Sequence, residues 1–131
     1  MLTLVGGQGL GKTHLLRKIG CGWMNSELQL TLNGGDAKDS KINALRKPMA
    51  ELSELDGTFR KSDMASLKTF ISSGRDSIRA PYGRKAIDRP RMTSFCATVN
   101  NSEFLNDATG SRRFWPVMVD SIDWDADIDF K

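Results

Sequence analysis

The segment from Gly6 to Thr13 reads Gly-Gly-Gln-Gly-Leu-Gly-Lys-Thr and directly follows the apolar run from Leu2 to Val5. It fills every fixed position of the pattern G-x-x-x-x-G-K-[ST]. Glycines let a backbone curl so that successive N–H groups point inward at phosphate oxygens, and a helix N-terminus favours an anion. The pattern therefore predicts a strand, a phosphate-binding loop and a helix, in that order.

The chemistry of the loop assigns expected roles to its residues. Lys12 is expected to reach the β and γ phosphates of a nucleoside triphosphate, and the hydroxyl of Thr13 to ligate Mg²⁺, which prefers oxygen ligands. His14 is the only histidine; without a second histidine or a cysteine cluster nearby, the sequence favours a helix-surface position over a metal or catalytic role. The expected nucleotide-binding residues are Gly6, Gly7, Gln8, Gly9, Leu10, Gly11, Lys12, Thr13 and His14. The alternative is a glycine-rich turn that binds no ligand.

Short apolar runs alternate with helical patterns, which predicts an α/β fold with a central, mainly parallel sheet flanked by helices. Strands are expected at about residues 2–5, 28–32, 48–53, 92–99 and 114–119, and helices at about 12–24, 37–46 and 62–73. In the first helix, the apolar side chains expected to face the sheet are Leu15, Leu16, Ile19, Trp23 and Met24. Residues 75–91 are rich in Arg, Pro and Gly, which indicates a long loop or a distorted hairpin.

The length of 131 residues suits one domain. We expect an ATPase domain over residues 1–119 and an acidic C-terminal tail over residues 120–131. No apolar run reaches the roughly eighteen residues of a membrane span, and the start of the chain lacks a leader pattern, so we expect a cytoplasmic protein. Cys21 and Cys96 are expected to be reduced thiols in or near the core.

The formal net charge of +3 is unevenly distributed. Between Arg60 and Arg91, nine basic residues stand against three acidic ones. Such a block suits a polyphosphate or a nucleic acid, and the alternative is a solvated surface. The three acidic residues of the block are Asp63, Asp76 and Asp88.

Three sets of polar residues are candidates for catalysis. Glu51 and Glu54 lie near the end of an apolar strand, where they are expected to divide the metal-binding and water-orienting roles; the alternative is exposed charge on a helix or edge strand. Asn100 follows another apolar strand and suits either contact with the γ-phosphate or attacking water, or a turn that caps a helix. Arg112 and Arg113 precede the last strand and suit either an arginine finger or a strand-edge ion pair.

The ordered segments GGQGLGKT, ELSELDG, LKTFISSGRD, RAPYGR, TVNNSEFL and DATGSRRFWPV resemble the virulence-associated protein E family, P-loop ATPases of phages, prophages and mobile islands. The resemblance covers about residues 2–119. It implies an ASCE/AAA+-like P-loop NTPase fold, a helicase-like domain related to superfamily three, ATP and Mg²⁺ as ligands, single-stranded or replicating DNA as partner, and a homo-oligomeric ring in the complete protein.

The same resemblance implies that Gly6 to Thr13 is the Walker A loop, that Glu51 and Glu54 are the Walker B carboxylates, that Asn100 is the sensor, and that Arg112 or Arg113 is the finger. A family stretch, D-x-x-R-x-P-Y-G-R, matches Asp76, Arg79, Tyr82 and Arg84 without an assigned role. Relative to the family, the fold is expected to be truncated at both ends, and Pro48 stands where a bulkier residue is usual.

Two other classes of function compete with this interpretation. The first is a non-motor P-loop protein, either a small nucleotide kinase whose lid is the arginine-rich segment, or a remnant that binds ATP without turnover. The second is a basic nucleic-acid-binding module. Tyr82 is the only aromatic residue within residues 75–91, so this segment offers little of the stacking platform that such modules use.

Overall fold

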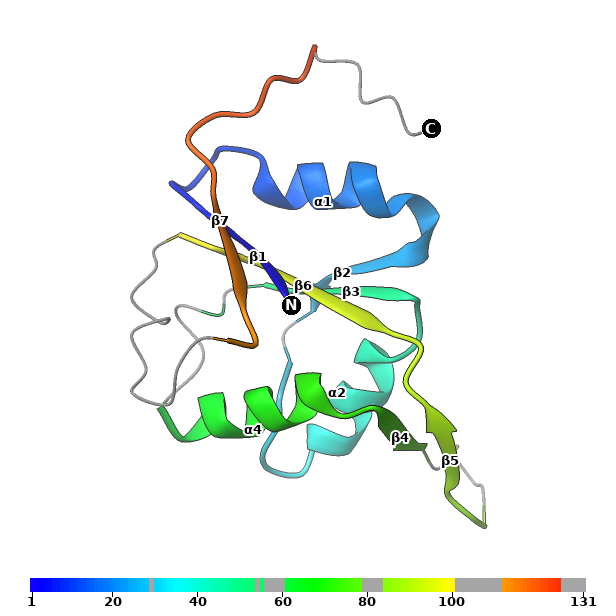
Figure 1. The fold of residues 1–131 in the computed structure, drawn as a ribbon. Coiled ribbons are helices and arrows are strands. Elements are labelled where there is room, and N and C mark those ends of the chain that lie inside the picture. Colours follow the sequence, from blue (N-terminus) through cyan, green and yellow to red (C-terminus); the bar gives the residue numbers. More distant parts are fainter. Residues whose placement is uncertain (29, 54, 56–60, 79–83, 101–111, 126–131) are drawn as a thin grey trace.

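The computed structural model describes residues 1–28, 30–53, 55, 61–78, 84–100 and 112–125. Five strands form one sheet in the order β2-β3-β6-β1-β7, and every neighbouring pair is parallel (Figure 1). Two further strands, β4 and β5, form an antiparallel hairpin. The strand bounds are β1 Leu2–Val5, β2 Met24–Leu28, β3 Met49–Leu52, β4 Arg75–Ile78, β5 Ile87–Pro90, β6 Ser94–Val99 and β7 Trp115–Met118.

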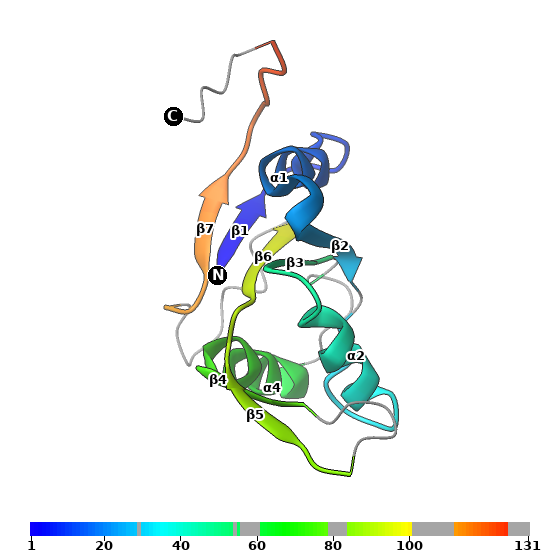
Figure 2. The same cartoon turned by 90° about the vertical axis from the view of Figure 1, so that its right-hand side faces the viewer.

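The helices cover both faces of the sheet. Helix α1 (Lys12–Gly20) lies on one face and is followed by the 3₁₀ turn η1 (Cys21–Trp23). Helices α2 (Ala37–Ala44) and α4 (Lys61–Ser72) lie on the other face (Figures 1 and 2). This three-layer arrangement confirms the predicted α/β class with a central parallel sheet. Within the described residues, no helix has the length and apolar character needed to cross a membrane.

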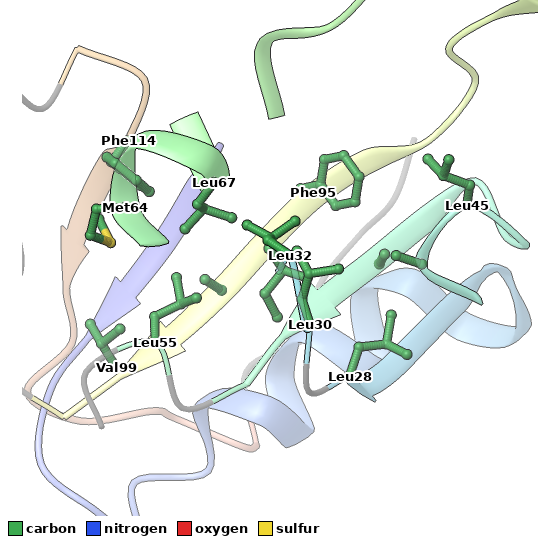
Figure 3. Close-up of a cluster of buried hydrophobic side chains, with 14 of the residues drawn as sticks. Leu28, Leu30, Leu32, Leu45, Leu55, Met64, Leu67, Phe95, Val99 and Phe114 are labelled. Atoms are coloured by element: carbon green, nitrogen blue, oxygen red, sulfur yellow. The ribbon is translucent and has the colours of Figure 1, made fainter. Parts of the chain in front are cut away.

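Each face of the sheet contributes to a separate apolar cluster, because successive strand residues point to opposite faces. Val5 joins the larger cluster, which lies between the sheet and helices α2 and α4. This cluster includes Leu67 of α4 and Phe95 of β6 (Figure 3). Leu4 joins the smaller cluster beneath α1, together with Leu16, Met24 and Cys96. The smaller cluster packs α1 against the sheet and thereby fixes the position of the loop that precedes the helix.

The first helix is shorter than the expected span of residues 12–24, because it ends at Gly20. A Cβ atom on Gly20 would lie 2.7 Å from the Cβ of Met24, and Cys21 has φ of +45°, so the chain turns sharply here. Ile19 and Trp23 are 42% and 69% exposed, so their predicted contact with the sheet is wrong. Cys21 is exposed as well, contrary to expectation, whereas Cys96 is buried as expected.

The second strand also differs from the prediction of residues 28–32, because β2 spans Met24–Leu28. Leu30 and Leu32 are buried in the larger cluster but lie outside the strand. The remaining expected strands and helices are present within a few residues of their predicted bounds. Pro48 precedes β3, and its carbonyl accepts a hydrogen bond from the Ser94 amide at 2.8 Å, so it does not interrupt the sheet.

The described ends of the arginine-rich segment form the antiparallel strands β4 and β5, which project away from the five-stranded sheet (Figure 2). Arg91, just after the hairpin, donates from Nε to both carboxylate oxygens of Asp76 at 2.9 and 3.2 Å and from Nη1 to the Phe70 carbonyl of α4. Its guanidinium lies 4.6 Å from the ring centroid of Phe70 and 5.3 Å from that of Phe95. Asp76, which the sequence left without a role, therefore anchors the base of the hairpin to the core.

Candidate functional site at the phosphate loop

The loop from Gly6 to Thr13 connects the carboxyl end of β1 to α1, at the edge of the sheet where ligands of parallel α/β folds bind. Gly9 and Gly11 each have φ of +85°, a conformation that side chains with a Cβ rarely adopt. Gly11 is also the N-cap of α1 and makes no side-chain capping bond. The first-turn N–H groups of α1 therefore receive no capping bond from the N-cap side chain, and a helix start of this kind suits an anion.

Lys12 is buried, and its ammonium group lies across the beginning of the loop. Its Nζ donates to the carbonyls of Gly6 at 2.8 Å and Gly7 at 2.7 Å. These bonds hold the positive charge at the loop rather than in open solvent. The structure thus places Lys12 where the sequence pattern expects a phosphate-binding cation.

Glu51 lies in the interior strand β3 and is fully buried, with 0% of its surface exposed. Its Oε1 accepts hydrogen bonds from the hydroxyls of Thr13 at 2.8 Å and Thr98 at 3.2 Å. The alternative of an exposed charge on a helix or edge strand is therefore wrong for Glu51. A hydroxyl and a carboxylate that meet beside the loop form the pair of oxygen ligands that Mg²⁺ prefers.

Thr98 belongs to β6, which separates β3 from β1, so it joins the carboxylate strand to the loop strand. Its Oγ1 also lies 3.4 Å from that of Thr13. Thr98 was not among the site residues predicted from the sequence. The sequence does contain a signal for Thr98. Thr98 and Asn100 are polar residues two positions apart at the end of an apolar strand, and residues at this spacing point to the same face of the sheet.

Asn100 immediately follows β6 and is exposed. It lines a cavity of about 500 Å³ with Gly6 and Gly7 of the loop and with Asp120, which follows β7. The structure therefore brings Asn100 to the beginning of the phosphate loop. The full lining is Val5, Gly6, Gly7, Leu10, Asn100, Met118, Val119 and Asp120.

Cys96 lies opposite Glu51 in the register of β3 and β6. Burial raises the pKa of the Cys96 thiol from its usual 9.0 to about 12, and the nearby charge of Glu51 adds to the increase. The thiol is therefore neutral at ordinary pH and donates at 3.6 Å to the Ala50 carbonyl. It serves as a core residue next to the site and not as a nucleophile.

Arg112 and Arg113 lie at the opposite end of the sheet from the loop. They precede β7, which runs parallel to β1, and the Arg113 carbonyl accepts from the Met1 ammonium at 2.7 Å. The Arg113 side chain donates from Nε to Ser72 Oγ of α4 at 2.7 Å. The chain from Met1 to Gly6 separates these arginines from their own loop by on the order of 15 Å. The structure does not bring them to this site.

Several predicted residues lie outside the described part of the chain, namely Glu54, Arg79 and Tyr82. Arg84 is described and exposed. His14 is exposed on α1 and contacts Trp124, whose ring centroid lies 4.9 Å away in an edge-on arrangement. Sequence reasoning missed Trp124, since it stands alone within an acidic segment and no motif includes it.

The model of the virulence-associated protein E-like domain matches residues 1–130. The chain belongs to this family. Among solved structures, it is similar to the A form apo structure of the NrS-1 C-terminal region, with a TM-score of 0.57 and 22% identity over 91% of this chain. A second apo structure of the NrS-1 C-terminal region gives a TM-score of 0.58 and 23% identity over 90% of this chain.

These likenesses concern the fold, and this member of the virulence-associated protein E-like family spans 28% and 29% of the length of those two chains. No match was found among curated proteins. The family assignment and the α/β fold class with a central, mainly parallel sheet, both predicted from the sequence, are confirmed.

Proposed function

We propose that this chain binds ATP with Mg²⁺ at the phosphate loop and hydrolyses its β–γ phosphoanhydride, as the motor domain of a phage or mobile-element replication protein. The observation that carries the proposal is the 2.8 Å hydrogen bond from Thr13 to Glu51. It joins the last residue of the loop motif to a buried carboxylate on a strand two positions away in the sheet. A simple glycine turn requires neither the carboxylate nor the hydroxyl.

The residues present fit the nucleotide and the metal ion. Positive-φ glycines shape the cradle, Lys12 supplies a cation beside it, and Thr13 and Glu51 supply hard oxygen ligands. When bound, Mg²⁺ would neutralise charge on the β and γ phosphates. Asn100 contributes a neutral donor at the beginning of the loop, where it would hold the γ-phosphate or a water molecule. Glu54 remains the predicted water-orienting carboxylate.

DNA binding is part of the same proposal, and the charge of the β4–β5 hairpin supports it. Arg75, Arg84, Lys85 and Arg89 are all exposed on or beside the two strands. Cations on a projecting hairpin are suited to the phosphates of a nucleic acid, and binding of this kind weakens as salt concentration rises. A homo-oligomeric ring and a cytoplasmic location remain predictions from the sequence and its family.

Calorimetric titration with Mg·ATP tests the binding step. Lys12→Ala is expected to lose detectable affinity, because it removes the cation at the loop. Lys18→Ala is the matched control, since Lys18 is exposed on the same helix and its loss should leave affinity unchanged. Equal affinity in Lys12→Ala and the parent chain would contradict the assignment.

Release of inorganic phosphate tests the reaction. The parent chain is expected to release phosphate from ATP, whereas Glu51→Gln is expected to lose turnover together with the Mg²⁺-dependent part of binding. A nucleotide kinase would instead transfer the phosphoryl group to a second nucleotide, and an inactive remnant would bind ATP and release nothing. Turnover in Glu51→Gln equal to that of the parent would assign the carboxylate to structure alone.

A further inference from the structure

Trp124 lies directly against the phosphate loop, although it follows the last strand by several residues. A Cβ atom added to Gly11 would lie only 2.6 Å from Cζ2 of the Trp124 ring. The ring meets His14 with an interplanar angle of 73°, and 40% of the residue remains exposed. The turn that presents it is held by a 3.0 Å hydrogen bond from the Asp125 amide to the Asp123 carboxylate. A partly exposed aromatic ring thus lies at the start of α1.

The two ends of the loop differ in chemistry, which gives a bound triphosphate a direction. Lys12 and Asn100 gather at the beginning of the loop, around Gly6 and Gly7. Since this lysine serves the β and γ phosphates, the γ-phosphate end belongs there. The nucleoside must then leave at the other end of the loop, past Gly11 and His14, where the Trp124 ring lies.

We propose that Trp124, braced by His14, is the platform on which the base of the bound nucleotide stacks. The inference rests on the proposed nucleotide-binding function and deepens it by assigning the base-binding residue. A base and an indole ring attract through their π faces, and the interaction accepts any nucleobase. His14 meets the indole edge-on, an arrangement favoured between aromatic rings, and so fixes the orientation of the platform.

The inference also explains a double constraint on Gly11. Its φ of +85° disfavours a side chain, and the Trp124 ring occupies the space that a Cβ would need. The glycine of the motif therefore serves both the curvature of the phosphate cradle and the close approach of the ring.

The test compares a ligand that has a base with one that lacks it. Affinities for Mg·ATP and for inorganic tripolyphosphate with Mg²⁺ are measured for the full chain and for Trp124→Ala. Trp124→Ala is expected to bind ATP about 10-fold more weakly and tripolyphosphate with unchanged affinity, because only ATP offers a base to the ring. Trp124→Phe is expected to retain most of the affinity for ATP. Trp23→Ala is the matched control, since Trp23 is 69% exposed at the far end of α1.

The outcomes separate this inference from the proposed function. If the parent chain binds neither ligand, the nucleotide-binding function is wrong, and the platform falls with it. If the parent binds both, unchanged ATP affinity in Trp124→Ala contradicts the platform alone. Equal weakening of both ligands also contradicts it, because the ring then only supports the loop.

A second measurement uses the folded chain without removing the ring. In the variant Trp23→Phe with Trp115→Phe, Trp124 is the remaining tryptophan, so the emission reports on this position alone. ATP is expected to change the emission, and tripolyphosphate is expected to leave it unchanged. The same response to both ligands, or to neither, would overturn the inference.

Discussion

A buried carboxylate, Glu51, and a buried thiol, Cys96, lie opposite each other on two neighbouring strands, and the carboxylate affects the chemistry of the thiol. Glu51 receives hydroxyl donors on its Oε1, whereas the thiol of Cys96 donates to a backbone carbonyl. Burial first, and the nearby Glu51 second, raise the pKa of Cys96 to about 12, so the thiol stays protonated well above the pH at which an ordinary thiol ionises.

The burial of Cys96 and the exposure of Cys21 predict a clear difference in the reactivity of the two thiols. At pH 8 a thiol reagent is expected to modify the exposed Cys21 quickly in the native chain and Cys96 only after denaturation. Cys21→Ser is the control, and rapid native labelling of that variant would contradict the burial of Cys96. Stability should also fall as the pH rises from about 9 towards 12, because the unfolded chain loses the Cys96 proton while the folded chain keeps it. Denaturant titrations of the parent and Cys96→Ala at several pH values measure this contribution.

At the scale of elements, the hairpin depends on one buried ion pair. The side chains of Arg91 and Asp76 are 9% and 4% exposed, whereas the pair of Arg75 and Asp88 on the same hairpin is 61% and 59% exposed. Removing one member of a buried pair leaves an uncompensated charge, so Asp76→Asn is expected to lower the free energy of unfolding by about 3–5 kcal/mol. Asp88→Asn, the matched control, is expected to cost at most about 1 kcal/mol. Chemical denaturation checks both, and equal losses would contradict the anchoring role of Asp76.

The elements also show what sequence patterns can and cannot predict. The loop motif and the apolar strands β1, β3 and β6 were predicted because motif and hydrophobicity are local signals. Strand β2 was predicted at the wrong residues, because its sequence Met-Asn-Ser-Glu-Leu is largely polar and lies at an edge of the sheet. The alternating residues Leu28, Leu30 and Leu32 have the pattern of a strand, and they are buried, but only Leu28 belongs to one. Thr98 and Trp124 were missed because their importance arises from contacts with residues 47 and 110 or more positions away.

At the scale of the whole molecule, the two ends of the sheet carry different parts of the proposed reaction. Lys12 and Glu51 lie at the carboxyl ends of the strands, whereas Arg112 and Arg113 lie at the amino end, beside the edge strand β7. An arginine in that position is too far from its own loop to reach a γ-phosphate. If either arginine acts as a finger, it must serve the site of a neighbouring copy.

This geometry predicts that turnover depends on association. The specific ATPase rate should rise with protein concentration, since a finger supplied by a neighbour can be worth about 10³-fold or more. Mixing Lys12→Ala with Arg113→Ala should restore activity, because each variant supplies the group that the other lacks. Lys12→Ala mixed with itself at the same total concentration is the control. A rate independent of concentration, with no recovery in the mixture, would exclude sharing of Arg113.

The position of β1 in the sheet has a consequence for the order in which the molecule is built. Strand β1 has β6 and β7 as its neighbours, and these two strands follow all the other described strands in the sequence. In a growing chain that has reached only the end of the hairpin, β1 lacks both of its neighbours, β6 and β7. The residues of the phosphate loop then have no neighbouring strands to support them. At ordinary rates of translation this interval lasts on the order of ten seconds. The residues of the phosphate loop are thus synthesised before most of the sheet and are among the last to acquire the support of their neighbouring strands.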